Sequence, residues 1–184
     1  MKKIIYFSLT LLCATVFSSC LSDDSEPYDE WRNHNDTWLQ EQMARTNPDG
    51  TPYYEKVVAT KWNPNAYVLM HWHNDRSLTA DKISPMSTST VDVKYLLRNY
   101  EGLGIDSSYL RTTPADSIFR SRLNTNIEGW VIGVTQMHVG DSVTMIVPYQ
   151  YGYGATQRGS ILPFTNLVFD IKLKGIPGFE VPVN

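Results

Sequence analysis

Residues 127–154 constrain the fold of this chain more than any other stretch. Apolar side chains recur over residues 127–137 at the three-and-four spacing of one helical face, which predicts a short apolar helix. Gly129 and Gly133 lie four residues apart inside this segment, although glycine lowers the stability of a helix interior. This composition indicates that another backbone or a ligand comes close to the helix.

Strands are predicted on both sides of this helix. Apolar residues alternate over residues 143–147 and the pattern ends at Pro148, so a mostly buried strand is expected there. An irregular flap with a short strand is expected over residues 109–126. The same alternation predicts strands over residues 53–61, 67–72, 91–97 and 167–173, with a turn at residues 62–65. Strands around one short helix, without strand–helix alternation, predict an α+β domain built on an antiparallel sheet.

The first twenty residues have the pattern of a secretory signal peptide. Lys2 and Lys3 precede an apolar run, residues 4–17, which is too short for a transmembrane helix. The run ends in Phe-Ser-Ser-Cys, which resembles a bacterial lipobox, in which the cysteine is lipidated and becomes the new N-terminus. Lipidation of Cys20 predicts a protein of the cell envelope, anchored in the outer membrane on its periplasmic or its surface side. An ordinary cleaved signal is the alternative.

The remaining chain is expected to form one domain with an N-terminal appendage. Residues 21–52 are interpreted as an acidic linker and a helix that Ser25 can cap, with acidic residues in its first turn. This helix is expected to cover the side of the domain, and a partner-binding arm is the alternative. Residues 53–184 are predicted to form the domain itself.

Composition and charge argue against several classes of function. The 42% of apolar and 19% of charged residues are typical of a folded protein, and a net charge of -3 without a basic cluster argues against a nucleic-acid partner. His71 and His73 would point to the same side of a strand, a spacing that can ligate a metal. No third ligand and no nucleophile is evident nearby, so a surface or packed histidine pair is favoured over a metal-dependent hydrolase. No metal and no cofactor are expected.

Several separated pieces of the sequence occur in an order that resembles one known family. These are residues 91–95, 105–108, 127–130, 134–137, 153–156, 161–163 and 167–170. Together they resemble the FKBP-type peptidyl-prolyl isomerases over about residues 91–176. The resemblance implies a twisted antiparallel sheet half-wrapped around one short helix, here with an N-terminal helical and strand extension. It also implies isomerisation of X-Pro bonds in exported proline-containing polypeptides and binding of macrolide-type ligands, whereas a non-catalytic binding module of an envelope complex is the alternative.

The resemblance further assigns residues to a pocket for the proline ring. Trp130 resembles the tryptophan beneath that ring, and Tyr153 resembles the tyrosine whose hydroxyl bonds a ligand carbonyl. Ile127 resembles the residue whose backbone N–H also meets the ligand. The implied catalytic residues are Tyr95, Asp106, Trp130, Tyr153 and Phe169, and the implied substrate contacts are Ile105, Ile127 and Ile161.

The chain departs from the family pattern at the walls of this pocket. Ile105 stands where the family usually has phenylalanine, which removes one aromatic wall. Thr125 and Asn126 stand where the family has an acid and an aliphatic residue. The flap is longer than usual, and three residues compete for the place of its aromatic side chain: Ser117, Ile118 and Phe119. Reduced or redirected activity is therefore expected.

Overall fold

The computed structural model describes residues 27–59 and 63–178. Its α-helices are α1 (Asp29–Ala44) and α2 (Glu128–Val134). Its strands are β1 (Glu55–Ala59), β2 (Asn63–Trp72), β3 (Thr90–Arg98), β4 (Gly104–Ser107), β5 (Phe119–Arg122), β6 (Ser142–Val147) and β7 (Leu167–Gly175). Single 3-10 turns are η1 (Arg76–Leu78), η2 (Leu123–Thr125) and η3 (Tyr149–Tyr151).

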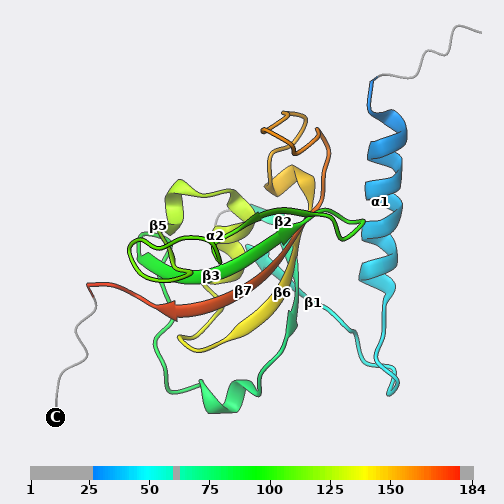
Figure 1. Ribbon diagram of the computed structural model, residues 1–184. Helices are drawn as coiled ribbons and strands as arrows, with labels where there is room; N and C mark the ends of the chain where they lie inside the picture. The colour runs from blue at the N-terminus through cyan, green and yellow to red at the C-terminus, as the bar shows by residue number, and fades with distance from the viewer. Residues whose placement is uncertain (1–26, 60–62, 179–184) are drawn as a thin grey trace, which may run out of the picture.

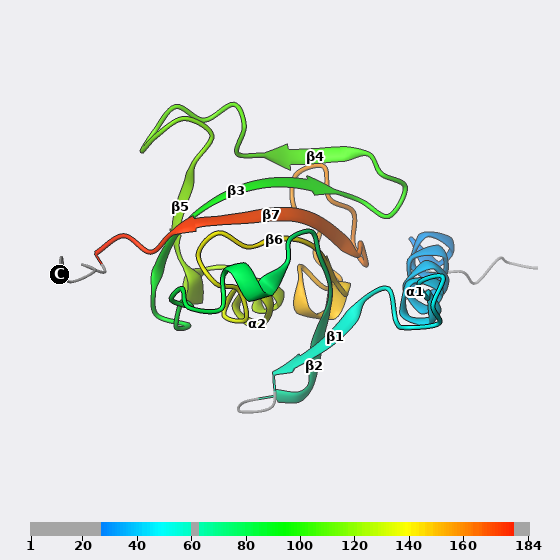
Figure 2. The same cartoon turned by 90° about the horizontal axis from the view of Figure 1, so that it is seen from below.

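The strands form one antiparallel sheet in the order β1-β2-β6-β7-β3-β4. β5 pairs with the first half of β3, on the edge where β4 pairs with its second half. Figures 1 and 2 show the twisted sheet curving around α2. The predicted class, an α+β domain with a twisted antiparallel sheet half-wrapped around one short helix, is thereby confirmed.

Alternation along the strands determines which side chains face α2. On β3 every second residue from Val91 to Leu97 is buried, as expected for a strand with one face in the core. The pairing of β3 with β7 sets Leu97 opposite Phe169. These side chains pack with Trp130 and Ile132 of α2 in the main core of the domain.

A second, smaller core lies on the opposite face of the sheet. Leu69, Ile146 and Val168 alternate along their strands with residues of the main core, and they pack against Leu39 of α1. Trp38 covers the side of this cluster. The prediction that the N-terminal helix packs on the domain is confirmed.

Several predicted boundaries were wrong. The helix predicted to reach residue 137 ends at Val134, because the following residues form turns in which the Gln136 amide donates to the Gly133 carbonyl. The turn predicted at residues 62–65 was wrong for residues 63–65, because Asn63 already pairs with Ala59 and begins β2. The predicted cap at residue 25 lies outside the described residues.

The two glycines of α2 allow this helix to pack directly on β6. A Cβ atom at Gly129 would lie 2.3 Å from Val147 Cγ1, and a Cβ atom at Gly133 would lie 2.1 Å from Met145 Sδ. Val147 and Met145 are fully buried. The prediction of a nearby backbone or ligand was therefore wrong, since side chains of β6 occupy that space.

A buried carboxylate holds the segment after β2 against the turn between α2 and β6. Asp141 is fully buried and accepts hydrogen bonds from Thr79 Oγ1 at 2.5 Å, the His138 amide at 2.8 Å and Asn74 Nδ2 at 3.0 Å. Arg76 Nε lies 3.6 Å from the same carboxylate. Burial works against the charged form, but these donors and the guanidinium outweigh it and lower the pKa of Asp141 below its ordinary value of 3.8.

The predicted signal peptide and the predicted lipidation also concern a part of the chain that the structure does not describe. Cys20 and the rest of the signal segment lie outside the described residues. Over residues 27–59 and 63–178, none of the helices combines the length and the apolar character needed to cross a membrane.

We expect Gly129→Ala to lower the free energy of unfolding by about 1–2 kcal/mol. The stiff, β-branched side chain of Val147 fills the space beside Gly129, so the cost of overpacking should exceed the gain in helix propensity. Gly133→Ala is the matched variant. Gly133→Ala should lower the free energy of unfolding by less, because the thioether of Met145 can rotate away from the added methyl group. Urea unfolding followed by tryptophan fluorescence measures both, and a more stable Gly129→Ala protein would contradict the packing argument.

We expect Asp141→Asn to lower the free energy of unfolding by about 2–3 kcal/mol at neutral pH, because it removes charge-assisted hydrogen bonds from a buried site. A lowered folded pKa means that the contribution of the carboxylate is present above pH 3.8 and is lost as the pH falls further. The difference from the natural protein should thus shrink below this pH. Asp81→Asn, at an exposed position in the same segment, is the control, and a difference that stays constant from neutral to acidic pH would refute this account.

Candidate active site

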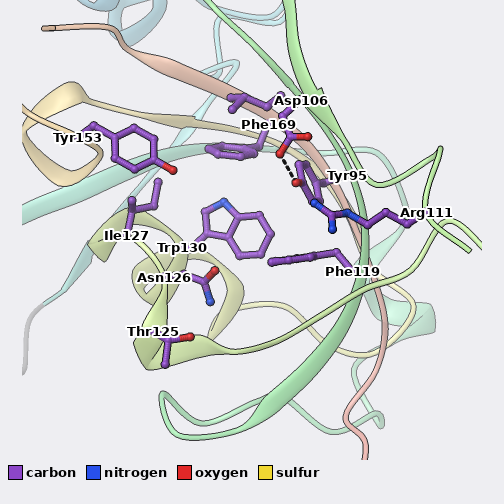
Figure 3. A pocket seen from close by; sticks show the side chains of 11 residues that line it. Tyr95, Asp106, Arg111, Phe119, Thr125, Asn126, Ile127, Trp130, Tyr153 and Phe169 are labelled. Atoms are coloured by element: carbon purple, nitrogen blue, oxygen red, sulfur yellow. Dashed lines mark hydrogen bonds between the residues drawn. The ribbon is translucent and has the colours of Figure 1, made fainter. Parts of the chain in front are cut away.

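A cavity of about 280 Å³ opens over the N-terminal end of α2. Side chains from β3, β4, β5, β7, α2 and the loop after β6 surround it, as Figure 3 shows. The lining residues are Tyr95, Leu97, Asp106, Arg111, Phe119, Thr125, Asn126, Ile127, Trp130, Tyr153 and Phe169.

Four aromatic rings form the floor and walls of this cavity. Trp130 lies at the floor and only 3% of it is exposed. Its ring centroid is 5.6 Å from that of Tyr95, 5.9 Å from that of Phe119 and 5.4 Å from that of Phe169. The interplanar angles of 77–86° are the edge-to-face arrangement that aromatic quadrupoles favour. The rings hold one another in place and present an apolar surface.

The regular elements account for most of this arrangement. Tyr95 and Leu97 lie on the same face of β3 because they are two residues apart, and Phe169 joins them from the paired position on β7. Phe119 begins β5, where it pairs with Val93 of β3. The sheet thus supplies three of the rings, and the packing of α2 supplies the indole.

One edge of the cavity carries a paired phenol and carboxylate. Tyr95 Oη donates to Asp106 Oδ2 at 2.5 Å, and Asp106 Oδ1 accepts from the Ser107 amide at 2.7 Å. Burial and this hydrogen bond raise the pKa of Tyr95 to about 12, although the Arg111 guanidinium beside the hydroxyl acts in the opposite direction. The Tyr95 hydroxyl therefore keeps its proton at neutral pH and stays engaged with Asp106.

Two donors at the opposite side of the cavity remain available to a ligand. Figure 3 shows the Tyr153 hydroxyl directed over the indole of Trp130, with Ile127 beside it. Within the part of the chain that the structure describes, neither the Tyr153 hydroxyl nor the Ile127 amide donates a hydrogen bond.

The structure brings most of the predicted site residues together. Tyr95, Asp106, Ile127, Trp130, Tyr153 and Phe169 line this one cavity. Ile105 and Ile161 do not line it, and they line a second cavity beside it instead. Their predicted contacts with a substrate in the first cavity have no support from this placement.

Sequence reasoning missed several residues of the lining. Phe119 occupies the place of the flap aromatic, which the sequence left open among three residues. Leu97 could have been found from its spacing to Tyr95 on an alternating strand. Arg111 lies in an irregular loop, where no periodicity indicates the direction of a side chain.

His71 in β2 and His73 directly after this strand are held by hydrogen bonds and stacking. His71 Nδ1 lies 2.8 Å from the Tyr53 carbonyl, and its ring stacks on that of Tyr53. His73 Nε2 lies 2.8 Å from Thr144 Oγ1. Over the described ranges, no cluster of three or more histidine, cysteine or acidic side chains is arranged to hold a metal ion.

Comparison with known proteins gives the family. A family model described as FKBP-type peptidyl-prolyl cis-trans isomerase matches residues 81–174. FK506-binding protein 1A of Aspergillus fumigatus is 33% identical over 95 residues, which make up 50% of this chain and 81% of that protein. The FKBP-type 22 kDa peptidyl-prolyl cis-trans isomerase of Escherichia coli is 36% identical over 90 residues, which make up 48% of this chain and 42% of that protein. FK506-binding protein 2 of Aspergillus oryzae is 36% identical over 78 residues, 42% of this chain and 57% of that protein, so the chain spans about half the length of several of its curated relatives.

Solved structures share the fold. The peptidyl-prolyl cis-trans isomerase of Pseudomonas syringae aligns with a TM-score of 0.61 and 23% identity, over 83% of this chain and 97% of that chain. FkpA of Escherichia coli aligns with a TM-score of 0.62 and 19% identity, over 80% of this chain and 61% of that chain. Since the family model matches half of the sequence and the fold agrees with it, this chain belongs to the FKBP-type peptidyl-prolyl cis-trans isomerase family.

Proposed function

We propose that this protein accelerates cis–trans exchange at X-Pro bonds of exported polypeptides. The observation that carries this proposal is the cavity with an aromatic floor and walls, lined on one side by Tyr153 and Ile127, whose hydroxyl and amide donate no hydrogen bond within the described part of the chain. A proline ring suits such a floor, because it is apolar and its nitrogen carries no hydrogen that would need an acceptor.

The mechanism requires only a change of environment around the amide. Rotation about a peptide bond costs about 18–20 kcal/mol because resonance is lost, and uncatalysed X-Pro exchange takes tens to hundreds of seconds. The apolar cavity disfavours the charge-separated form of the planar amide. The Tyr153 hydroxyl and the Ile127 amide would stabilise the carbonyl of the twisted amide more than that of the planar one, which lowers the barrier.

The edge formed by Tyr95 and Asp106 has a different part in this mechanism. Since the Tyr95 hydroxyl donates to Asp106, it does not compete with Tyr153 for the substrate carbonyl. Its ring remains a wall of the cavity. Ile105 contributes no ring to this cavity, and we therefore retain reduced or redirected activity as part of the proposal.

The loop that carries Tyr153 is held by α1. Asn35 is fully buried and accepts from the Asn166 amide at 2.8 Å through its side chain, and from Asn166 Nδ2 at 2.6 Å through its carbonyl. Asn166 in turn accepts from the Tyr149 amide at 3.0 Å, and the Tyr149 carbonyl accepts from the Gly154 amide at 2.8 Å. This series of hydrogen bonds connects α1 to the residue next to Tyr153.

We also propose that the protein acts in the cell envelope, attached to the outer membrane by lipidation of Cys20. The lipobox-like sequence before this residue supports the proposal. Mass spectrometry of the mature N-terminus tests it, and an unmodified cysteine there would refute it. Macrolide-type ligands are a further proposed ligand class, supported by the family membership.

We expect the purified chain to accelerate exchange in short X-Pro peptides, as measured by NMR without a coupled protease. Tyr153→Phe should lower kcat/KM about tenfold, the effect of losing one hydrogen bond worth about 1.4 kcal/mol. Trp130→Ala should abolish the acceleration. Tyr151→Phe is the matched control, because its hydroxyl donates to the Asn65 carbonyl, outside the cavity.

The result also decides between catalysis and binding. If the intact chain binds proline peptides but accelerates none of them, whatever residue precedes proline, it is a binding module. Equal effects of Tyr153→Phe and Tyr151→Phe would refute the role of the Tyr153 hydroxyl as the donor.

We expect Asn35→Ala to speed amide hydrogen exchange in residues 149–154 while exchange in β3 and β7 changes little, because the loop loses its buried partner. The free energy of unfolding should fall by about 1–3 kcal/mol, since the buried Asn166 amide loses its acceptor while Asn166 Nδ2 keeps the backbone carbonyl of residue 35. Asn47→Ala, in an exposed turn, is the control. A uniform increase in exchange over the whole sheet would contradict a local role of Asn35.

A further inference from the structure

Asn126 lines the cavity with a polar group that the proposed mechanism does not use. It directly precedes Ile127 at the N-terminal end of α2, and it lies in the same lining as Trp130. Asn126 is also one of the departures from the family pattern, which has an aliphatic residue at this place. Since a few well-placed polar groups decide which ligand an apolar cavity accepts, this side chain bears on specificity.

The hydrogen bonds of Asn126 fix the orientation of its side-chain amide. The nitrogen Nδ2 donates to Ser121 Oγ at 2.9 Å and to two backbone carbonyls, those of Arg122 at 2.9 Å and Leu123 at 3.3 Å. Because backbone carbonyls only accept hydrogen bonds, these contacts identify the nitrogen and leave the oxygen Oδ1 on the other side. Leu123 is fully buried, which anchors this turn in the core.

The oxygen of this amide is an unused acceptor that faces the cavity. Figure 3 shows the Asn126 oxygen on the side of the Trp130 indole and the nitrogen on the opposite side. Over residues 27–59 and 63–178, no donor of the protein forms a hydrogen bond with Asn126 Oδ1. The adjacent Thr125 hydroxyl donates to the Arg122 carbonyl at 2.7 Å and is thus already engaged. Asn126 therefore presents a fixed acceptor to a ligand that lies above the indole.

An unmodified proline ring leaves this acceptor without a partner. The ring presents only C–H groups to the wall, and its nitrogen carries no hydrogen in an X-Pro bond. When such a ring fills the space above the indole, it displaces water from Asn126 Oδ1 and offers no hydrogen bond in return. Leaving a desolvated acceptor unpaired is expected to weaken binding about tenfold.

A hydroxyl group on the proline ring would remove this cost. Its O–H can donate to Asn126 Oδ1, while the remaining ring keeps its contact with the indole and the aromatic walls. Because the amide at the proline nitrogen has no N–H, a donor that faces this wall from the position of the ring has to be carried by the ring itself. Sites that hydrogen-bond a substrate hydroxyl discriminate against the analogue without it, since their own polar group is then left unpaired.

We propose that the cavity selects prolines whose ring is hydroxylated, and that Asn126 is the specificity-determining residue. The ring hydroxyl donates to Asn126 Oδ1, and Trp130 supports the ring from below. The redirected activity is then directed at hydroxyproline-containing polypeptides. This inference rests on the proposed function, and it names the substrate class of that same site.

The test uses the full chain and a series of labelled peptides that differ only in the ring of a single proline residue. The series contains proline, the isomers of hydroxyproline, and the corresponding methyl ethers and fluorides. The ethers and fluorides keep a polar substituent but have no O–H to donate. Affinity is measured by fluorescence anisotropy, and kcat/KM by NMR exchange relative to the uncatalysed rate of each peptide. We expect one hydroxyproline isomer to gain about tenfold over proline in both quantities, and the ethers and fluorides to gain nothing.

Asn126→Val should remove this preference, because it removes the acceptor. The ratio between hydroxyproline and proline is expected to fall below about twofold, and the affinity for unmodified proline should rise. Ser121→Ala is the matched control. It removes one partner of Asn126 Nδ2 in the same turn, whereas the two backbone carbonyls still orient the amide, so it should keep the preference. The series of rings on the natural chain needs no variant and decides the question if Asn126→Val does not fold.

The outcomes separate this inference from the proposed function. A preference for hydroxyproline that depends on Asn126, without acceleration of any peptide, would refute catalysis and leave the selection of the bound ring in place. Acceleration of unmodified proline peptides, without a gain for any hydroxyproline isomer, would overturn the inference and leave the proposed function standing. A gain that the methyl ethers share, or that survives Asn126→Val, would also overturn it, since donation to this acceptor would not be the cause.

Discussion

The direct packing of α2 on β6 is the contact on which the site depends. Gly129 and Gly133 carry no side chain, and Val147 and Met145 therefore fill the space that side chains would take. The short helix is set deep in the curved sheet, and Trp130 is pressed among three rings supplied by the strands. An indole enclosed in this way does not need to reorganise when a ligand enters, which is the condition for tight recognition of a strained state.

The few polar groups around the cavity divide into those that are paired and those that are not. Tyr95 and Asp106 satisfy each other at one edge. Tyr153 and Ile127 line the other side, and over the described residues neither the Tyr153 hydroxyl nor the Ile127 amide donates a hydrogen bond. Because an apolar surface lies between them, the position of the free donors fixes where a carbonyl oxygen would be placed. The proposed activity thus depends more on this asymmetry than on any single reactive group.

The regular part of the fold could be predicted from the sequence, since burial alternates along β3, and along β7 from Phe169 onward, as the apolar residues do. Tyr95 lies on β3 and Trp130 on α2, and the family resemblance was enough to assign both residues to the proline pocket. Phe119 could not be placed in advance, because β5 is four residues long and only its pairing with β3 decides which side chain faces inward.

The contacts made by α1 could not be predicted from sequence patterns. Asn35 is a buried polar residue in a mostly polar helix, and its partner Asn166 lies 131 positions away, so no periodicity marks either of them. Ile105 and Ile161 were assigned to the proline pocket by resemblance alone. The family model matches residues 81–174, which leaves out α1, and this helix completes the separate cavity that they line.

Adjacent residues of β6 serve different helices: Met145 packs toward α2, and Ile146 packs toward α1. Mutations on the two faces of the strand are for this reason expected to act almost independently during evolution. The face toward α1 can change together with that helix while the face toward α2 keeps the packing beneath the cavity. Asn35 is the exception, because its hydrogen bonds join the two sides of the molecule, and change at this position would be felt by both.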